Sequence, residues 1–398
     1  TGLLFLTPAP AGAFDLVGVV GHAPAGVKVE LRARLEGGRW TRWSDAHVGQ
    51  SAWAHGATAA QFRTSRPVKG LRLHYVSIPR ELRTPARAAR QAAPLPFPTT
   101  NAVQPKIIPR SSWDAGNRCR PRSTPGLGRI QTAIVHHTVS LNGYSRSQAA
   151  SMVLGICLFH RDGNGWNDIG YNFLVDRYGQ VFEGRAGGID QPVVGAHAGG
   201  FNTPSTGISV IGNFSRTPPP KPAMNALAKV LAWKLSIHGV PAKGHTTVVS
   251  GGGPDTGYKA GTRVTLQRIS GHRDADLTEC PGAALYRRLP ALRNQVAKLE
   301  GAFSRLSLAV PAVATQYGSG VPLSGRLSPA RGGETIEIRE LSAGRERVVA
   351  SATTAPDGTW FATPLAQRSG VFRAVYLGGE SSPGVISNVA WVTVTPAK

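Results

Sequence analysis

The sequence is short of acidic residues and of long apolar runs. Only 22 of its 398 residues are Asp or Glu, against 45 Lys or Arg, and the formal net charge is +23 at pH 7. No apolar run is long enough to cross a bilayer, which excludes a transmembrane helix. So large an excess of positive charge predicts an anionic partner or an anionic surrounding matrix.

Motifs of nucleic-acid recognition are also missing. The sequence contains no helix-turn-helix pattern, no zinc-finger spacing and no aromatic ribonucleoprotein motif. Its basic residues are mainly arginines, spread along the chain in Pro- and Ala-rich surroundings. We therefore expect no nucleic acid as a partner, and we favour the anionic polymers of a cell envelope rich in phosphate or carboxylate groups.

Cysteine is scarce, since the chain has only Cys119, Cys157 and Cys280. If Cys280 is a metal ligand, Cys119 and Cys157 are free to form a disulfide, which would suit an oxidising extracellular setting. Two unrelated buried thiols are the alternative. The first residues lack the basic stretch that opens a signal peptide, so we expect either the remainder of a signal segment or a first strand.

Hydrophobic periodicity predicts a β-rich domain in residues 1–83, followed by a linker. Apolar and charged residues alternate in Val27–Leu35 and again in Leu71–Val76, which favours strands of a small sandwich or barrel. Residues 84–106 are rich in Pro, Ala and Arg. We predict a linker there, because so many prolines prevent a helix or a central strand.

Residues 107–300 are predicted to form an α/β domain with a mixed central β-sheet flanked by helices. Ser145 and Gln148 have the spacing of a capping box, which predicts the start of an apolar helix through Phe159. The turn Asp176–Gly179 joins two predicted strands as a hairpin, so the sheet is not purely parallel. Further helices are predicted at Pro222–His238 and Ala283–Leu299, and strands at Tyr171–Val175, Gln180–Phe182 and Gly207–Ile211.

Residues 304–398 return to β structure. Ile336–Arg339 alternates, Pro356–Trp360 has the composition of a hairpin turn, and Val389–Val394 predicts a terminal strand. Short strands separated by polar turns are typical of an immunoglobulin-like β-sandwich, which is the fold that we predict for this domain.

Three residues of the middle region have the chemistry of a zinc site. His272 and Cys280 lie eight residues apart, and His136 lies far upstream. Together they supply nitrogen and sulfur ligands and leave one tetrahedral position open, as in a hydrolytic zinc site. The alternative is a surface histidine near a buried or disulfide-bonded cysteine. Neighbouring side chains on a strand point to opposite faces, so only one of His136 and His137 can face the site.

A series of ordered sequence blocks strengthens the metal interpretation. The middle region closely resembles the family of peptidoglycan recognition proteins and type 2 N-acetylmuramoyl-L-alanine amidases. Flanking β modules often accompany actinobacterial members of this family. The matching blocks are Arg110–Trp113, Ile134–Thr138, Gly165–Val175, Gly179–Arg185, Gly195–Asn202, Gly207–Phe214, Gly271–Asp274 and Thr278–Gly282.

The resemblance implies a function for individual residues. In the family, zinc is held at the positions of His136, His272 and Cys280, and members that lack the cysteine bind peptidoglycan without cutting it. Tyr171 and Thr278 occupy positions of catalytic residues, with a buried hydroxyl as the alternative in each case. Substrate contacts are expected from His197, Asn202, Trp166, Asp168 and His137, although a tight turn or a packed core would also explain them. The segment Val249–Tyr258 is an insertion relative to the compact phage enzymes. We expect it to border the groove of this chain.

We therefore expect a secreted, cell-wall-associated, monomeric Zn²⁺ amidase that cleaves the amide between N-acetylmuramic acid and L-alanine in bacterial peptidoglycan. A peptidoglycan-binding module without turnover is the main alternative. A cysteine peptidase that uses Cys157 with His160 is a further one, but no orienting Asn or Asp is evident.

Overall fold

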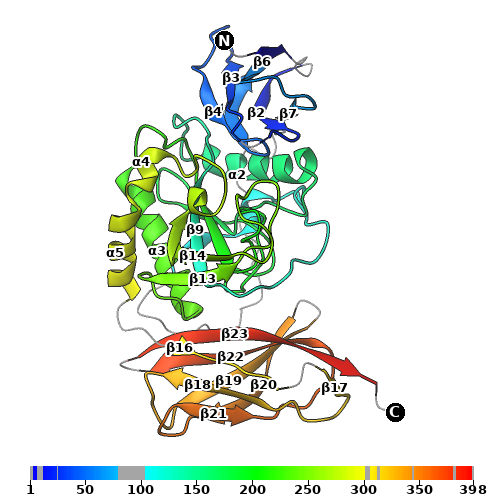
Figure 1. Ribbon diagram of the computed structural model, residues 1–398, viewed down its shortest axis with the longest axis vertical. Helices are drawn as coiled ribbons and strands as arrows, with labels where there is room; N and C mark the ends of the chain where they lie inside the picture. The colour runs from blue at the N-terminus through cyan, green and yellow to red at the C-terminus, as the bar shows by residue number, and fades with distance from the viewer. Residues whose placement is uncertain are drawn as a thin grey trace.

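A computed structural model of the chain describes residues 3–6, 12–24, 26–78, 104–300, 305–311, 314–342, 345–379 and 382–396. Three regions follow one another along the long axis, with a mixed α/β domain between two β domains (Figure 1). Most of the predicted linker, residues 84–103, lies outside the described residues. No described helix is long and apolar enough to cross a membrane.

The N-terminal domain consists of two small antiparallel sheets. The predicted alternation at Val27–Leu35 corresponds to β3, whose side chains alternate between buried and partly exposed. Apolar side chains from both sheets, such as Phe14, Leu31 and Phe62, form one core. The sheet orders are β1-β6-β3-β4 and β5-β2-β7, with β1 Leu3–Leu6, β2 Phe14–Val20, β3 Val29–Arg34, β4 Ser44–Ala46, β5 Ser51–Ala57, β6 Ala59–Thr64 and β7 Arg72–Val76.

The middle domain is built on a six-stranded mixed sheet, as predicted, in the order β15-β9-β12-β10-β11-β8. Strand β9 lies inside it, with parallel neighbours on both sides, and the predicted hairpin joins β10 to β11. The strands are β8 Ile107–Ile108, β9 Thr132–His137, β10 Phe173–Val175, β11 Val181–Glu183, β12 Ser205–Val210 and β15 Ile269–Gly271. A separate hairpin of β13 His245–Val249 and β14 Arg263–Gln267 flanks the sheet.

Helices cover both faces of this sheet. Helix α3 (Lys221–Ile237) and helix α5 (Leu289–Glu300) share a core with Val135 and Ile208 on one face. Helix α2 (Gln148–Leu158) shares a second core with Leu174 on the other face. Short helical segments complete the domain: α1 Arg110–Trp113, the π-helical turn η2 Phe159–Gly163, the 3-10 turn η3 His272–Asp274 and α4 Ala283–Tyr286.

Two details of the helix predictions were wrong. The capping box is only half formed, because the backbone N–H of Ser145 donates to Gln148 Oε1 (2.7 Å) while the Ser145 hydroxyl pairs with Ser147. Helix α2 therefore begins at Gln148 without a side-chain cap. The predicted helix over Ala283–Leu299 is divided into α4 and α5.

The C-terminal domain also has two sheets, which enclose a core that includes Leu323, Ile338 and Trp360. Their orders are β16-β18-β21 and β17-β23-β22-β19-β20. The predicted hairpin at Pro356–Trp360 is wrong, because this turn joins β20 to β21, which belong to different sheets. The strands are β16 Arg305–Leu306, β17 Ala314–Gln316, β18 Leu323–Ser328, β19 Thr335–Ser342, β20 Arg345–Thr353, β21 Thr359–Ala362, β22 Gly370–Gly379 and β23 Ser382–Thr395.

Candidate metal centre and groove

Two parallel strands bring the candidate ligands together at one edge of the sheet. His136 lies near the end of β9, and His272 follows directly after β15, which pairs with β9 in parallel. Because the ends of neighbouring parallel strands lie side by side, the two histidine rings meet, with centroids 4.4 Å apart. Cys280 returns to the same place through a loop that is closed by the Arg273 N–H, which donates to the Cys280 carbonyl (2.9 Å).

The donor atoms of these three residues have the spacing that a zinc ion requires. One nitrogen from each histidine and the Cys280 sulfur all lie within 4.8 Å of one another. His136 Nδ1 is 3.7 Å from Cys280 Sγ. Ligands bound tetrahedrally at zinc–nitrogen and zinc–sulfur distances lie about 3.5 Å apart. The residues present therefore fit a zinc ion.

We refer to His136, His272 and Cys280 as the metal trio, or the trio. Each of its two histidines is oriented by a partner on the ring nitrogen that does not face the other ligands. His272 Nε2 is 2.8 Å from Asp276 Oδ2, which leaves Nδ1 as the donor to an ion. His136 Nε2 is 3.1 Å from His197 Nδ1. A carboxylate on the far nitrogen of a ligating histidine is the usual outer support of a protein metal site, so Asp276 belongs to this centre.

The two histidines have opposite pKa shifts. Burial, with the neighbouring His272 as a smaller cause, lowers the pKa of His136 well below its usual range, so its ring is neutral and able to donate a lone pair. Burial also opposes the charge on His272, but the hydrogen bonds to Asp276 and Cys280 raise its pKa to about 9. The Asp276 carboxylate beside His272 thus creates a place where positive charge is stabilised.

His137 lies on the opposite side of β9 from His136, as strand alternation requires. Its backbone N–H donates to Cys280 Sγ (3.4 Å), and its Nδ1 accepts from the Phe214 N–H (3.2 Å). Its Nε2 is buried and has no hydrogen-bond partner among the described residues. His137 therefore holds the Cys280 sulfur in position and lines the cavity beside it.

The two hydroxyl residues flank the trio. Tyr171 is 1% exposed, and its ring centroid is 5.3 Å from that of His136. Burial raises the pKa of Tyr171 above its usual value, so its hydroxyl stays protonated. Thr278 Oγ1 accepts from the Cys280 N–H (3.1 Å), which ties its position to the third candidate ligand.

Four of the five predicted substrate contacts line a single cavity. His197, Asn202, Trp166 and His137 line a cavity of about 340 Å³ together with His272, Thr278 and Cys280. Asn202 also fixes the loop around His197, since its Oδ1 accepts from the backbone N–H groups of His197 (2.7 Å) and Ala198 (3.0 Å). Pro254 and Asp255, from the predicted insertion, border the same cavity.

Asp168 does not belong to the groove, which corrects its prediction as a substrate contact. Its carboxylate is fully buried and accepts hydrogen bonds from the N–H groups of Ile169 and Ala186. It also forms an ion pair with Arg110 (3.1 Å). Pairing with these three donors satisfies a buried charge, so Asp168 supports the fold around the following strand.

Cys119 and Cys157 form the predicted disulfide, with their Cα atoms 6.1 Å apart. This bond leaves no thiol at Cys157, which removes the nucleophile of a cysteine peptidase. His160 is buried nearby, and its Nδ1 accepts from the Gly170 N–H (3.1 Å). Although Cys119, Cys157 and Asp168 lie close together, the bonded sulfurs do not offer thiolate ligands to a metal.

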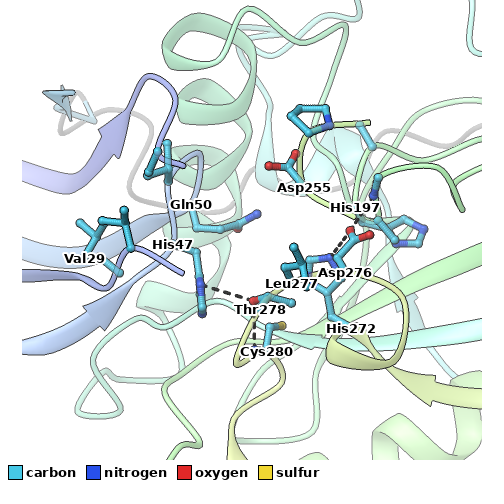
Figure 2. Close-up of a pocket in the computed structure, with 18 of the residues that line it drawn as sticks. Val29, His47, Gln50, His197, Asp255, His272, Asp276, Leu277, Thr278 and Cys280 are labelled. Carbon is cyan, nitrogen blue, oxygen red and sulfur yellow. Dashed lines mark hydrogen bonds and ion pairs between the residues drawn. The ribbon is translucent and has the colours of Figure 1, made fainter. Parts of the chain in front are cut away.

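His47 and Gln50 of the N-terminal domain are site residues that were not predicted from the sequence. Both line the cavity beside the trio, and Figure 2 shows them across from Thr278 and Cys280. Gln50 Oε1 accepts from the Tyr171 hydroxyl (2.6 Å), and His47 Nδ1 is 3.3 Å from Thr278 Oγ1. No sequence pattern identifies them, because His47 and Thr278 are 231 residues apart.

Comparisons with known proteins single out the middle domain. The family model described as "N-acetylmuramoyl-L-alanine amidase" matches residues 126–283. Peptidoglycan-recognition protein SC2 of Drosophila melanogaster is 30% identical over 190 residues, which are 47% of this chain and 86% of that protein. N-acetylmuramoyl-L-alanine amidase of Mus musculus is 30% identical over 187 residues, 46% of this chain and 30% of that protein.

Among solved structures, peptidoglycan recognition protein-LE in complex with tracheal cytotoxin is 30% identical, with a TM-score of 0.36. That match covers 46% of this chain and 92% of the solved chain. The metal trio, Tyr171 and Thr278 all lie within the segment that the family model matches, whereas His47 and Gln50 precede it.

Proposed function

This chain belongs to the family of peptidoglycan-recognition proteins and N-acetylmuramoyl-L-alanine amidases, and we propose that it is a zinc-dependent amidase of bacterial peptidoglycan. The bond cleaved is the amide between the lactyl carbonyl of N-acetylmuramic acid and the nitrogen of L-alanine. Water supplies the oxygen that remains on the muramyl carboxylate, and the stem peptide leaves with a free α-amine.

The observation that carries this proposal is the complete donor set of His136, His272 and Cys280, with donor atoms within 4.8 Å of one another. Three protein ligands leave a coordination position open, which is the arrangement of a catalytic zinc site and not of a structural one. A zinc ion held there would supply Lewis-acid polarisation of the scissile carbonyl and activation of a water molecule.

The remaining polar residues act on the substrate or on the ligands. Tyr171 and Thr278 are assigned to stabilising negative charge on the carbonyl oxygen or to holding a proton, because both hydroxyls lie beside the trio. His197 and Asp276 hold the rings of His136 and His272 in place. Trp166 and Asn202 are assigned to binding the glycan and peptide along the cavity wall.

A second function, binding of peptidoglycan without turnover, is favoured by the net charge of +23, which would hold the protein on anionic wall polymers. The intact thiol ligand supports the enzyme over this alternative. The disulfide Cys119–Cys157 supports an extracellular location at the cell wall. We assign the protein to act there as a monomer.

The test compares the parent protein with Cys280→Ala and His272→Ala variants on purified cell wall. We expect the parent to bind zinc stoichiometrically and to release stem peptides with a free L-alanine amine. Both variants should lose zinc and release. His245→Ala is the matched control, because His245 is exposed on β13 and pairs with Gln267 away from the trio. Zinc-loaded parent protein that releases nothing would sink the amidase proposal and leave the binding function.

Removing the outer support of the metal gives a graded version of this test. Asp276→Ala takes away the acceptor of His272 Nε2 while keeping all three ligands. We expect zinc affinity to fall by about 10- to 100-fold, which is the usual effect of such a partner. Competition with a chromophoric chelator measures it, and an unchanged affinity would show that Asp276 does not orient the ligand.

A further inference from the structure

The N-terminal β domain supplies one wall of the cavity that is lined by two of the candidate ligands, His272 and Cys280. Nothing in the family match includes this domain, because the match begins at residue 126. The cavity wall on this side is mainly apolar, with two polar side chains nearest the trio. The N-terminal residues that line it are Ala23, Pro24, Gly26, Val27, Val29, Ala46, His47, Val48 and Gln50.

A tight turn between β4 and β5 presents the two polar side chains together. Gln50 N–H donates to the His47 carbonyl (2.9 Å), which closes a four-residue turn over His47–Gln50. Gly49 has φ +83° at the third position, a conformation that favours glycine, as in a type II turn. The Asn164 side chain of the middle domain donates to the Gly49 carbonyl (2.7 Å), so the turn is tied to the segment that follows η2.

The domain is docked through a shared hydrophobic core and not through polar contacts alone. Leu16, Trp53 and Ile78 belong to the same buried cluster as the side chains of helix α2. The contact is tight enough that a methyl group at Gly155 of α2 would overlap Leu16, and one at Gly18 would overlap Phe159. Because the N-terminal and middle domains share this core, the N-terminal wall is a fixed part of the groove and does not act as a movable lid.

Gln50 determines which hydrogen-bond donor faces a substrate in the cavity: its own amide nitrogen in place of the Tyr171 hydroxyl. Without substrate, the hydroxyl proton of Tyr171 is directed at Gln50 Oε1. The Gln50 amide nitrogen points into the space between this turn and the two loops that carry Asp255 and Leu277 (Figure 2). No described residue accepts a hydrogen bond from that nitrogen, and Gln50 lines the cavity. Gln50 Nε2 therefore carries two protons into the groove next to Tyr171.

His47 has the corresponding relation to Thr278. The Thr278 oxygen already accepts from the Cys280 N–H (3.1 Å), so its hydroxyl proton is available to His47 Nδ1. This bond restricts the rotation of the hydroxyl beside the third candidate ligand. The ring of His47 also lies 6.3 Å, centroid to centroid, from the ring of His137.

We propose that Gln50 is a substrate-binding residue supplied by the N-terminal domain, and that its Nε2 donates to a carbonyl oxygen of the muramyl-peptide. His47 is a positioning residue that acts through Thr278. This inference rests on the proposed function, since it names the groove's ligand as an N-acylated muramyl-peptide. It makes the N-terminal domain part of the amidase site, with a direct effect on substrate recognition.

Gln50→Glu, made in the whole chain, separates the two roles of Gln50. A carboxylate can still accept a hydrogen bond from Tyr171 but cannot donate one to the substrate. Gln50→Ala removes both contacts. Gln61→Ala is the control, because Gln61 is another glutamine of this domain, but it is buried and pairs with Arg32 (2.6 Å), outside the cavity. All variants are first compared with the parent by thermal unfolding.

The main readout is the binding of a soluble muramyl-tripeptide in a Cys280→Ala background, measured by calorimetry so that no turnover is needed. We expect Kd to rise about tenfold for both Gln50 variants and to stay unchanged for Gln61→Ala. In the active protein the same variants should raise KM. If Gln50→Glu binds as tightly as the parent, or if either Gln50 variant binds more tightly or cleaves faster, the proposal is overturned.

His47 is tested by the division of its effect between kcat and KM. His47→Ala should lower kcat about threefold with little change in KM, and His47→Asn should restore much of it by returning an acceptor near the Nδ1 position. Equal loss in both variants would contradict the positioning role. A parent protein that binds the tripeptide but does not cut it would fail the amidase proposal alone, whereas one that neither binds nor cuts would overturn both proposals.

Discussion

The two β domains at the ends of the chain have similar architecture but different relations to the groove. Each consists of two sheets around a single core, and each packs against the middle domain (Figure 1). The N-terminal domain reaches the metal trio through His47 and Gln50. Among the described residues that line the cavity, none comes from the C-terminal domain.

The C-terminal domain docks on the other side of the sheet. Val375 and Ile386 join the hydrophobic cluster formed by α3 and α5. Arg373 of β22 is 2.8 Å from Asp190 of the middle domain and 2.5 Å from Glu346 of its own domain, and its side chain is almost completely buried. Fold class is thus a poor guide to the function of these domains, because the docking face decides which one meets the substrate.

The largest effect is expected from breaking the N-terminal junction. Leu16→Ala should destabilise the protein by about 4 kcal/mol, because Leu16 is fully buried against α2 and its loss leaves a cavity. It should also weaken muramyl-tripeptide binding, since the groove wall loses its support. Chemical denaturation and calorimetry measure the two effects.

Leu323→Ala is the matched control in the C-terminal core, where Leu323 is also fully buried. It should cost a similar amount of stability without changing the Kd for the tripeptide. If both variants bind equally well, the N-terminal junction has no special relation to the groove.

The next effect tests the C-terminal junction. Arg373→Ala removes the buried guanidinium that pairs with both Asp190 and Glu346, which should destabilise the protein by about 3 kcal/mol. Tripeptide affinity should not change, because this junction lies outside the cavity. Arg63→Ala, which breaks a solvent-exposed pair with Glu30, should have no measurable effect on stability. A lower affinity in Arg373→Ala would show that both β domains influence the groove.

The smallest effect concerns a buried acid where the chain leaves the middle domain. Burial raises the pKa of Glu300 to about 7, although the Ala242 N–H donates to its carboxylate. The folded protein therefore retains a proton that the unfolded chain releases above its ordinary value of 4.5. Stability contributed by this group is present below pH 4.5 and is lost as pH rises toward 7.

Glu300→Gln should remove that pH dependence and stabilise the protein by on the order of 1 kcal/mol above pH 7. Unfolding free energies measured at pH 5 and pH 8 test this, and the difference between variant and parent should be larger at pH 8. A difference that is larger at pH 5 would contradict the assigned sign. Because Glu300 lies outside the cavity lining, zinc affinity should be unchanged.

Much of the architecture was predictable because its signals are local. Alternation identified β3, the turn Asp176–Gly179 predicted the mixed sheet, and the predicted helices overlap α2, α3 and α5. The capping box at Ser145 and the unbroken helix after Ala283 were wrong, because the actual caps and breaks depend on neighbouring segments. The disulfide was predictable only after Cys280 had been set aside as a ligand.

The residue types of the candidate site were determined by the sequence itself: His136, His272 and Cys280 carry the donor atoms. Their number, together with the family resemblance of the surrounding blocks, predicted an open zinc site. Only the tertiary structure decided that Asp168 turns into the core and that Gln50 meets Tyr171 across 121 residues of chain. The physical reason is that ligand chemistry belongs to single side chains, whereas contacts between distant segments arise from docking of whole domains through their buried faces.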